Sequence, residues 1–447
     1  MSEQNKLSSA EKMSMVAHKF FNENNIIYFH GIFYLYNDGI WRIESTENTE
    51  AWIAKEYLKL HAEPAMERHK KEITKMIQDM TYNTYRKKIK ELNENARRKQ
   101  INIKSGILNL NDFSICSYTK DDFCFYKIPF DYIKEPQCPL LSRFLTSSMG
   151  FGEVVDTDDY RKVMKFIQEW MGYTLMPGNP HEKALLLMGR GRNGKGTLLH
   201  IWHHILGKEN VSTLGLDALN HPQMVHLTRH KLANLSKDSN ANSQLDTETI
   251  KSAVAGEEVS ANPKYIAPYD FKFTAKLIMA CNDLPFTKST DENIRERFYV
   301  IPFDCQFTEQ QRDRFLKQKL ETESEQIFSW AVNGLRSLEL RGHFDPPERC
   351  IVSLNRYMTD NNSIAMWLEE GELTDPKRRC KRSDAWKDYK LYCEDSKLHP
   401  FSKSRFFRQM EKQGFRLSLI DGGWWYNGLK PMINSEYANN PITHIKG

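Results

Sequence analysis

This sequence of 447 residues lacks long hydrophobic runs. Its longest purely apolar stretches, such as Ala184–Met188, fall far short of the roughly 18 residues that a membrane-spanning helix needs. Residues 1–12 are polar, unlike the apolar core of a signal peptide. We therefore expect no membrane association and a cytoplasmic location.

Paired cysteines are also lacking. The 8 Cys residues are scattered, with no Cys-x-x-Cys pair and no Cys/His cluster at zinc-ligand spacing. We expect reduced, mostly buried thiols rather than disulfides or structural zinc. Glycine and proline, at 22 and 17 residues, are too few for a collagen-like or wholly disordered chain. The length predicts roughly three globular domains, at about 150 residues each.

An excess of positive charge is present only near the C-terminus. The net charge is +5, yet residues 376–447 alone hold 15 Lys and Arg against 7 Asp and Glu. The remainder of the chain is therefore slightly acidic. A basic C-terminal module favours a polyanionic partner for that part of the protein.

The patterns along the chain predict a mixed N-terminal region followed by an α/β core. Residues up to about 20 show no long apolar face and are expected to fray. Short β-branched and aromatic runs between residues 26 and 43 predict a β meander, and helical spacing follows to about residue 100. Residues 101–110 and 123–128 return to strand character. From 184 to 303, short apolar strands alternate with helical segments, which is typical of a parallel sheet flanked by helices.

The strongest chemical signal is a glycine-rich turn between an apolar strand and a helix. Backbone N–H groups converge on phosphate oxygens where side chains are absent, and a helix N-terminus favours an anion. Lys195 supplies a positive charge for the β- and γ-phosphates. Gly196 stands where the strict pattern has Ser or Thr, so Thr197 becomes the expected Mg²⁺ ligand. The alternative is a turn that merely starts a helix. The expected nucleotide-binding residues are Gly189, Gly191, Asn193, Gly194, Lys195, Gly196 and Thr197.

Three later segments hold residues suited to nucleotide hydrolysis. Asp238 follows a short strand, where a carboxylate would hold Mg²⁺ and polarise water. Asn282 ends a buried strand and would orient the attacking water. Arg297 precedes a further strand and would reach the γ-phosphate of a neighbouring subunit, as in ring ATPases. Taken singly, Asp238 is equally a surface acid, and Arg297 a salt-bridged surface residue.

The order of these motifs resembles superfamily 3 helicases. The resemblance is to the phage and plasmid primase-helicases, a group that includes poxvirus primase-helicases and staphylococcal mobile-element replication proteins. Residues 26–43 and 101–110 resemble the helicase-associated N-terminal region of this family, and the C-terminus resembles its winged-helix tail. The motif segments that carry the resemblance are residues 189–197, 231–238, 256–261, 276–285 and 297–303.

The resemblance implies a fold and a division into domains. It implies an α/β protein whose AAA+-like P-loop ATPase core contains a parallel sheet, with a mixed α+β N-terminal domain and a C-terminal winged helix. We expect a helicase-associated domain over 1–140, the ATPase over 141–360 and the winged helix over 361–447. Primer synthesis is expected from a separate protein, because the segment before Gly189 shows no convincing Asp-x-Asp pair with a partner His.

The resemblance also implies residue roles. Lys195 would bind phosphates, Asp238 would be the acid of the second motif, Asn282 the sensor, and Arg297 the finger that acts on the neighbouring subunit, with Arg295 a nearby substitute. The family has a β-hairpin between the second motif and the sensor strand, with a basic tip that touches DNA. Residues 262–265 would form this tip and make Lys264 a DNA contact, the alternative being a plain surface turn.

Two helices followed by a hairpin are predicted near the C-terminus, which is the order of a winged helix. The second helix would offer Lys403, Arg405 and Arg408 to DNA in the major groove, with Phe406, Phe407 and Met410 on its buried side. A basic solubilising module or a protein-docking site is the alternative.

These features together predict an ATP- and Mg²⁺-dependent DNA helicase or replication initiator of a phage, plasmid or pathogenicity island. We expect a hexameric ring that moves along single-stranded DNA and also binds duplex DNA. Movement in the 3′ to 5′ direction is implied by the resemblance alone. The alternatives are a DNA-binding initiator that uses nucleotide only as an assembly switch and a nucleoside monophosphate kinase, whose loop also suits Gly-Lys-Gly-Thr.

Overall fold

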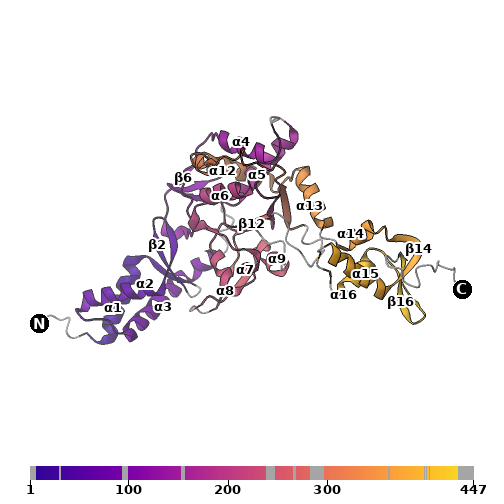
Figure 1. The fold of residues 1–447 in the computed structure, drawn as a ribbon. Coiled ribbons are helices and arrows are strands. Elements are labelled where there is room, and N and C mark those ends of the chain that lie inside the picture. The colour runs from indigo at the N-terminus through magenta and orange to yellow at the C-terminus, as the bar shows by residue number, and fades with distance from the viewer. Residues whose placement is uncertain are drawn as a thin grey trace. The chain divides into compact units, whose positions relative to one another are not determined.

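The computed structural model describes residues 7–29, 32–92, 99–152, 157–237, 247–264, 268–281, 296–360, 363–396, 398, 400–401 and 403–430. These residues form two compact units (Figure 1). The first comprises the described residues up to 281 together with 296–351, and the second starts at Val352. None of the helices in this part of the chain combines the length and apolar character of a membrane span.

The N-terminal region joins three helices to an antiparallel sheet. Helix α1 (Ser9–Asn24) begins at a capping box between Ser8 and Glu11. The expectation that residues up to about 20 fray is wrong, because Val16 and Phe20 of α1 are buried in an apolar cluster with residues of the sheet and the next helices. The predicted meander is confirmed. The remaining elements are β1 (Ile26–Phe29), β2 (Ile32–Asn37), β3 (Ile40–Glu44), α2 (Thr46–His61) and α3 (Glu67–Leu92).

A second small sheet consists of β4 (Gln100–Ile103), β5 (Gly106–Asn109) and β6 (Ile115–Cys116). The strand expected over 123–128 is not formed. The oxygen of Cys124 accepts a hydrogen bond from the Trp41 N–H at 2.7 Å, and the Ile128 N–H donates to the Asn102 oxygen at 2.8 Å. These isolated bonds tie an extended segment to two different sheets, and its buried residues explain the strand-like pattern in the sequence.

The core of the first unit is a five-stranded parallel sheet, in the order β13-β7-β12-β9-β8. This confirms the predicted parallel sheet. The strand that precedes the glycine-rich loop, β7, lies between β12 and β13, and in β7 and β12 nearly every residue is buried. The strands are β7 (Ala184–Met188), β8 (Val211–Ser212), β9 (Ala233–Lys237), β12 (Lys276–Cys281) and β13 (Phe298–Pro302).

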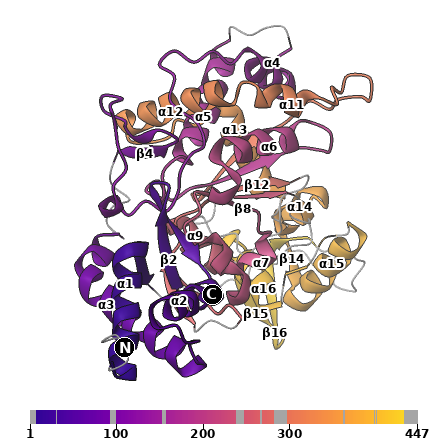
Figure 2. The ribbon, with the colours of Figure 1, turned by 90° about the vertical axis from the view of Figure 1, so that its left-hand side faces the viewer.

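Helices lie on both sides of this sheet. Figures 1 and 2 show α5, α6 and α12 on one side of β12, with α7 and α9 on the other. The α-helices described between residues 139 and 360 are α4 (Pro139–Ser148), α5 (Asp158–Tyr173), α6 (Lys195–Leu206), α7 (Leu216–Leu219), α8 (Pro222–Val225), α9 (Thr247–Ala255), α11 (Leu316–Glu321), α12 (Ser324–Arg341) and α13 (Glu348–Asp360). Helix α13 crosses the boundary between the units.

Helices α5 and α12 approach closely because each presents a glycine to the other. A Cβ atom on Gly172 would lie 2.3 Å from the Ala331 oxygen, and one on Gly334 would lie 2.4 Å from the Gln168 oxygen. Larger residues would force the helices apart.

Beyond α13, the described residues of the second unit form three helices and a three-stranded antiparallel sheet of order β14-β16-β15. Its core is built around Trp367, Tyr389, Phe406 and Tyr426. The predicted helices and hairpin are present, and α14 and β14 precede them. The elements are α14 (Ser363–Glu370), β14 (Thr374–Lys381), α15 (Arg382–Asp395), α16 (Lys403–Lys412), β15 (Leu417–Ile420) and β16 (Gly423–Leu429).

Candidate nucleotide site and nucleic-acid contacts

The loop between β7 and α6 has a backbone shape that requires glycine at two positions. Gly189 has φ of +153°, and a Cβ atom there would lie 2.4 Å from the Phe303 oxygen. Gly194 has φ of +99°, and its Cβ would lie 2.5 Å from the Ser148 hydroxyl oxygen. A side chain at either position would need both an unfavourable backbone conformation and displaced neighbours. The two glycines therefore shape the loop that leads into the N-terminus of α6.

Lys195, the first residue of α6, directs its ammonium group into this loop. The side chain is buried, with 5% of the residue exposed. Its Nζ donates to the Asn193 Oδ1 at 3.1 Å, to the Arg190 oxygen at 3.3 Å and to the Gly189 oxygen. Phosphate oxygens would compete with these oxygens for the same ammonium group, so the arrangement fits a nucleotide phosphate chain.

The loop is also bound to the segment that follows β13. The Asn193 side-chain amide donates to the Phe303 oxygen at 3.1 Å, and the Phe303 N–H donates to the Met188 oxygen at 2.7 Å. The Phe307 N–H donates to the Arg192 oxygen at 2.9 Å. The Gln306 side-chain amide also donates to the Gly191 oxygen, at 3.3 Å. Sequence reasoning included Phe303 in the last motif segment but missed residues 304–307, because a single side-chain bond and main-chain bonds leave no recognisable residue pattern.

Gly191 and Gly196 lie on the open side of the loop. A Cβ atom at Gly191 or Gly196 would have nothing within 4 Å. Thr197, one residue further along α6, is half-buried. A Ser or Thr therefore fits sterically at position 196, where the strict loop pattern places a metal-binding hydroxyl.

Two predicted catalytic residues lie outside the described residues. Strand β9 ends at Lys237 and β12 at Cys281, and Asp238 and Asn282 come directly after them. Arg295 and Tyr265 also lie outside the described residues. The carboxyl ends of β9 and β12 are at the same edge of the sheet as the end of β7, where ligands of such sheets bind.

Arg297 lies at the opposite edge of the sheet from the glycine-rich loop. It directly precedes β13, in which Phe298 pairs with Ala184 and Pro302 with Met188. Strands of this length place the two edges about 15 Å apart, so Arg297 is distant from Lys195 of its own chain. Its guanidinium group forms an ion pair with the Glu182 carboxylate, and its side chain is 28% exposed.

Lys264 lies between the strands of the expected hairpin. Strands β10 (Glu258–Ala261) and β11 (Tyr269–Lys272) pair antiparallel, and Lys264 is exposed in their connection. The Ser260 hydroxyl donates to the Asp270 carboxylate across the pair at 2.5 Å. The described part of the connection thus presents a cation to solvent.

Helix α16 of the second unit has one buried and one exposed face. Phe406 and Met410 are buried, whereas Lys403 and Arg408 are exposed. Phe407, expected on the buried side, is only half-buried, and the Arg382 guanidinium lies 3.8 Å from the centre of its ring. Arg405 belongs to α16, but its side chain lies outside the described residues.

Two family profiles match separate parts of the chain. One, described as D5 N terminal like, matches residues 14–150. The other, a family of unknown function (DUF5906), matches residues 187–297 and thus includes the glycine-rich loop and Arg297.

Two viral proteins that are provisionally named as helicases are similar in sequence. The protein of Acanthamoeba polyphaga mimivirus is 26% identical over 175 residues, covering 35% of this chain and 17% of the relative. The protein of Frog virus 3 (isolate Goorha) is 22% identical over 251 residues, covering 51% of this chain and 26% of the relative. The matched region is thus about a quarter or less of the length of these relatives.

Among solved structures, the C-terminal region of NrS-1 aligns with nearly the whole chain. One apo structure of that region, residues 305–718, covers 94% of this chain and 99% of its own, with 10% identity and a TM-score of 0.49. An A-form apo structure gives 92% and 98% coverage, 11% identity and a TM-score of 0.48.

Proposed function

We propose that this protein is an ATP- and Mg²⁺-dependent DNA helicase that acts in replication. The observation that carries the proposal is Lys195, held inside a loop that only glycine at 189 and 194 can form, at the N-terminus of α6. The similarity to viral proteins named as helicases supports the same function.

Nucleotide would bind with its phosphates on the loop residues 189–197, where Lys195 and the N-terminal N–H groups of α6 stabilise the negative charge. The chemistry that Mg²⁺ would supply at this site is neutralisation of the negative charge that develops on the phosphates. Thr197 and Asp238 are the residues proposed to hold the metal ion, and Asn282 is proposed to orient the attacking water.

The position of Arg297 supports action between subunits. An arginine some 15 Å from the loop of its own chain can reach a γ-phosphate only on a neighbouring copy. We therefore propose a ring, of six subunits by family resemblance, in which Arg297 exchanges its Glu182 partner for the phosphate of the next subunit.

The DNA contacts are proposed from two features. Lys264, exposed between β10 and β11, would touch a single DNA strand inside the ring and would move when ATP is hydrolysed. The family resemblance implies that the helicase then travels along this strand in the 3′ to 5′ direction. The order of helices and strands from α14 to β16 supports a winged helix, in which α16 would offer Lys403, Arg405 and Arg408 to duplex DNA. We propose domains over 1–140, 141–360 and 361–447. We also propose that this helicase serves a phage, plasmid or pathogenicity island and that its partners include a separate primase.

The test is ATP hydrolysis with and without single-stranded DNA, for the unaltered protein and Lys195→Ala. Exposed Lys317→Ala in α11 is the matched control. We expect DNA-stimulated hydrolysis that is lost only in Lys195→Ala. Absence of hydrolysis under all conditions would reject the motor and leave a nucleotide-gated DNA binder, and phosphate transfer to a nucleoside monophosphate would indicate a kinase.

A further inference from the structure

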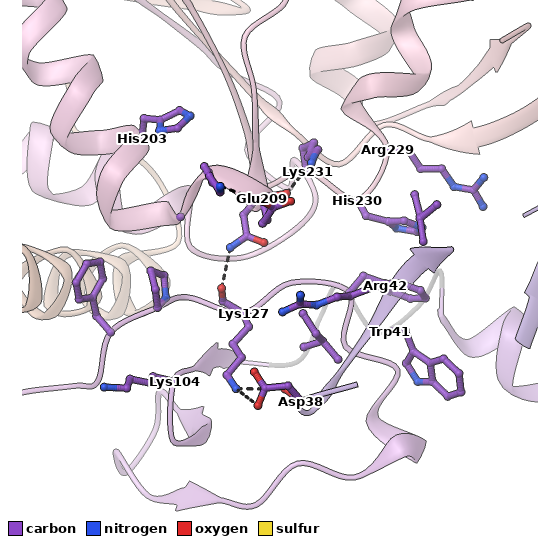
Figure 3. Close-up of a pocket in the computed structure, with 18 of the residues that line it drawn as sticks. Asp38, Trp41, Arg42, Lys104, Lys127, His203, Glu209, Arg229, His230 and Lys231 are labelled. Carbon is purple, nitrogen blue, oxygen red and sulfur yellow. Dashed lines mark hydrogen bonds and ion pairs between the residues drawn. The ribbon is translucent and has the colours of Figure 1, made fainter. Parts of the chain in front are cut away.

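A pocket of about 1050 Å³ lies between the N-terminal sheets and the ATPase core of the first unit. Figure 3 shows Asp38 and Arg42 on one wall and His203, Glu209 and Lys231 on the other. The core contributes the last turn of α6, the segment that follows it and the residues that precede β9. The pocket therefore adjoins the amino ends of the parallel strands, whereas the glycine-rich loop lies at their carboxyl ends, and a ligand here leaves the nucleotide site accessible.

The charge of the pocket is strongly positive. Its acidic residues are Asp38, which pairs with Lys127 at 3.0 Å, and Glu209, which lies 3.9 Å from Lys208. Its cationic lining residues are Arg42, Lys104, Lys127, Lys208, Arg229 and Lys231. This leaves a clear cationic excess, which attracts a polyanion.

Arg42 and Lys104 are the cations best placed to bind such a ligand. Both are exposed, and within the described ranges neither forms an ion pair. Arg42 belongs to β3, and Lys104 to the turn between β4 and β5. They come from two separate sheets, so they would contact different points along an extended ligand.

Aromatic residues hold the wall of the pocket in place. Arg229 is 4% exposed, and its guanidinium lies 4.7 Å from the centre of the Tyr269 ring. The His230 ring stacks on Phe125 with centroids 4.2 Å apart, and its Nε2 is 2.9 Å from the Tyr34 hydroxyl. Since His230 and Phe125 are half-buried, part of this ring pair is available for contact with a base.

Titration of one lining residue, His203, agrees with a positive environment. Burial lowers the pKa of His203, and the neighbouring His200, Lys237 and His204 lower it further. Burial also lowers the pKa of Lys231, whose Nζ donates to the Glu209 oxygen. A phosphate group would relieve both effects by supplying negative charge.

We propose that this pocket binds the sugar-phosphate backbone of single-stranded DNA, as a nucleic-acid site separate from Lys264 and α16. That the strand is DNA rests on the proposed function. Separated cations combined with a ring pair suit a strand of several nucleotides, because successive phosphates engage different cations while a base stacks. The volume is also at the upper end of pockets for small ligands, about 300–1,000 Å³.

The experiment measures binding of a labelled single-stranded oligonucleotide of about 16 nucleotides to the full chain at several salt concentrations. The variant is Arg42→Ala/Lys104→Ala. The matched control is Lys55→Ala/Lys59→Ala, which removes two exposed lysines of α2. We expect roughly tenfold weaker binding for the pocket variant and a salt slope reduced by about 0.7 for each lost phosphate contact, with the control unchanged. Unchanged affinity in the pocket variant would overturn the proposal.

A second arm distinguishes a strand from a free nucleotide. Two variants are compared: Lys195→Ala alone, and Lys195→Ala combined with Arg42→Ala/Lys104→Ala. The first should bind labelled ATP no more tightly than the second. Nucleotide binding that persists with Lys195→Ala and is lost with the pocket variant would overturn the strand assignment. Neither readout requires hydrolysis, so failure of the motor in the ATPase test is distinguishable from failure of this site.

Discussion

The side-chain amide of Asn193 donates a hydrogen bond to the main-chain oxygen of Phe303 at 3.1 Å, and its Oδ1 accepts one from the Lys195 ammonium at 3.1 Å. One side chain thus connects the glycine-rich loop, the residue that follows β13 and the lysine proposed to bind phosphate. Because β13 also follows Arg297, the same strand is bound to the loop at one end and carries the arginine at the other.

Replacing Asn193 tests this connection. Asn193→Ala should weaken ATP binding by roughly tenfold, because a buried hydrogen bond to a charged group contributes about 1.5 kcal/mol or more. Titration of a fluorescent ATP analogue measures the effect. Asn193→Asp keeps the oxygen that accepts from Lys195 but loses the amide that donates to Phe303, and it should also lose most of the affinity for ATP. Full affinity for ATP in both variants would show that Asn193 does not position Lys195.

The two glycines of Gly-Lys-Gly have opposite tolerances. Gly194→Ala should abolish ATP binding, since its Cβ would lie 2.5 Å from the Ser148 hydroxyl oxygen at a φ of +99°. Gly196→Ala should bind ATP normally, because its Cβ has nothing within 4 Å.

Gly196→Ser extends this comparison to the metal. It adds a hydroxyl at the usual metal-binding position, so it should restore hydrolysis at low Mg²⁺ to a Thr197→Ala variant. ATP hydrolysis is measured as a function of Mg²⁺ concentration. If Gly196→Ser does not restore hydrolysis, Thr197 is not a ligand of the metal ion.

Variants of Arg297 and Glu182 distinguish a catalytic role of Arg297 from a structural one. If the pair only stabilises the fold, Arg297→Ala and Glu182→Gln should have similar effects. If Arg297 acts on the neighbouring subunit, Arg297→Ala should reduce ATP hydrolysis by about 10³-fold or more while ATP still binds, and Glu182→Gln should retain hydrolysis. Equal losses in the two variants would contradict the intersubunit role.

His181 should make the stability of the fold depend on pH. Burial lowers the pKa of His181, and the positive charge of Lys276 adds to the effect. The unfolded chain therefore binds the proton more tightly than the folded one, so the free energy of unfolding should fall as pH decreases below about 6.5.

Thermal unfolding between about pH 7.5 and pH 5 tests this effect. His181→Phe keeps a ring against Tyr173 and Phe344 but removes the proton site, and should reduce the slope. The exposed His18→Phe is the control. An identical slope in both variants would show that His181 does not contribute.

Local patterns were sufficient where each element follows from its own residues. The β meander, the parallel sheet and the helices of the second unit could all be predicted, because hydrophobic period and turn residues act over a few positions. The β10–β11 hairpin is expected from the family resemblance and not from local patterns. The same logic failed at α1, where three buried residues among many polar ones gave too weak a period. It also failed at 123–128, where burial without regular pairing imitates a strand.

The sequence by itself determined the chemistry offered at the candidate nucleotide site: glycines, a lysine and a helix start stand at a spacing that suits phosphate. Only the tertiary structure decided how those residues are held and what surrounds them. The main-chain bonds of residues 303–307 to the loop, the placement of Arg297 at the far edge of the sheet and the cationic pocket around Arg42 and Lys104 all join segments distant in sequence. Such contacts depend on how the strands are ordered in space, and no local pattern of residues encodes that order.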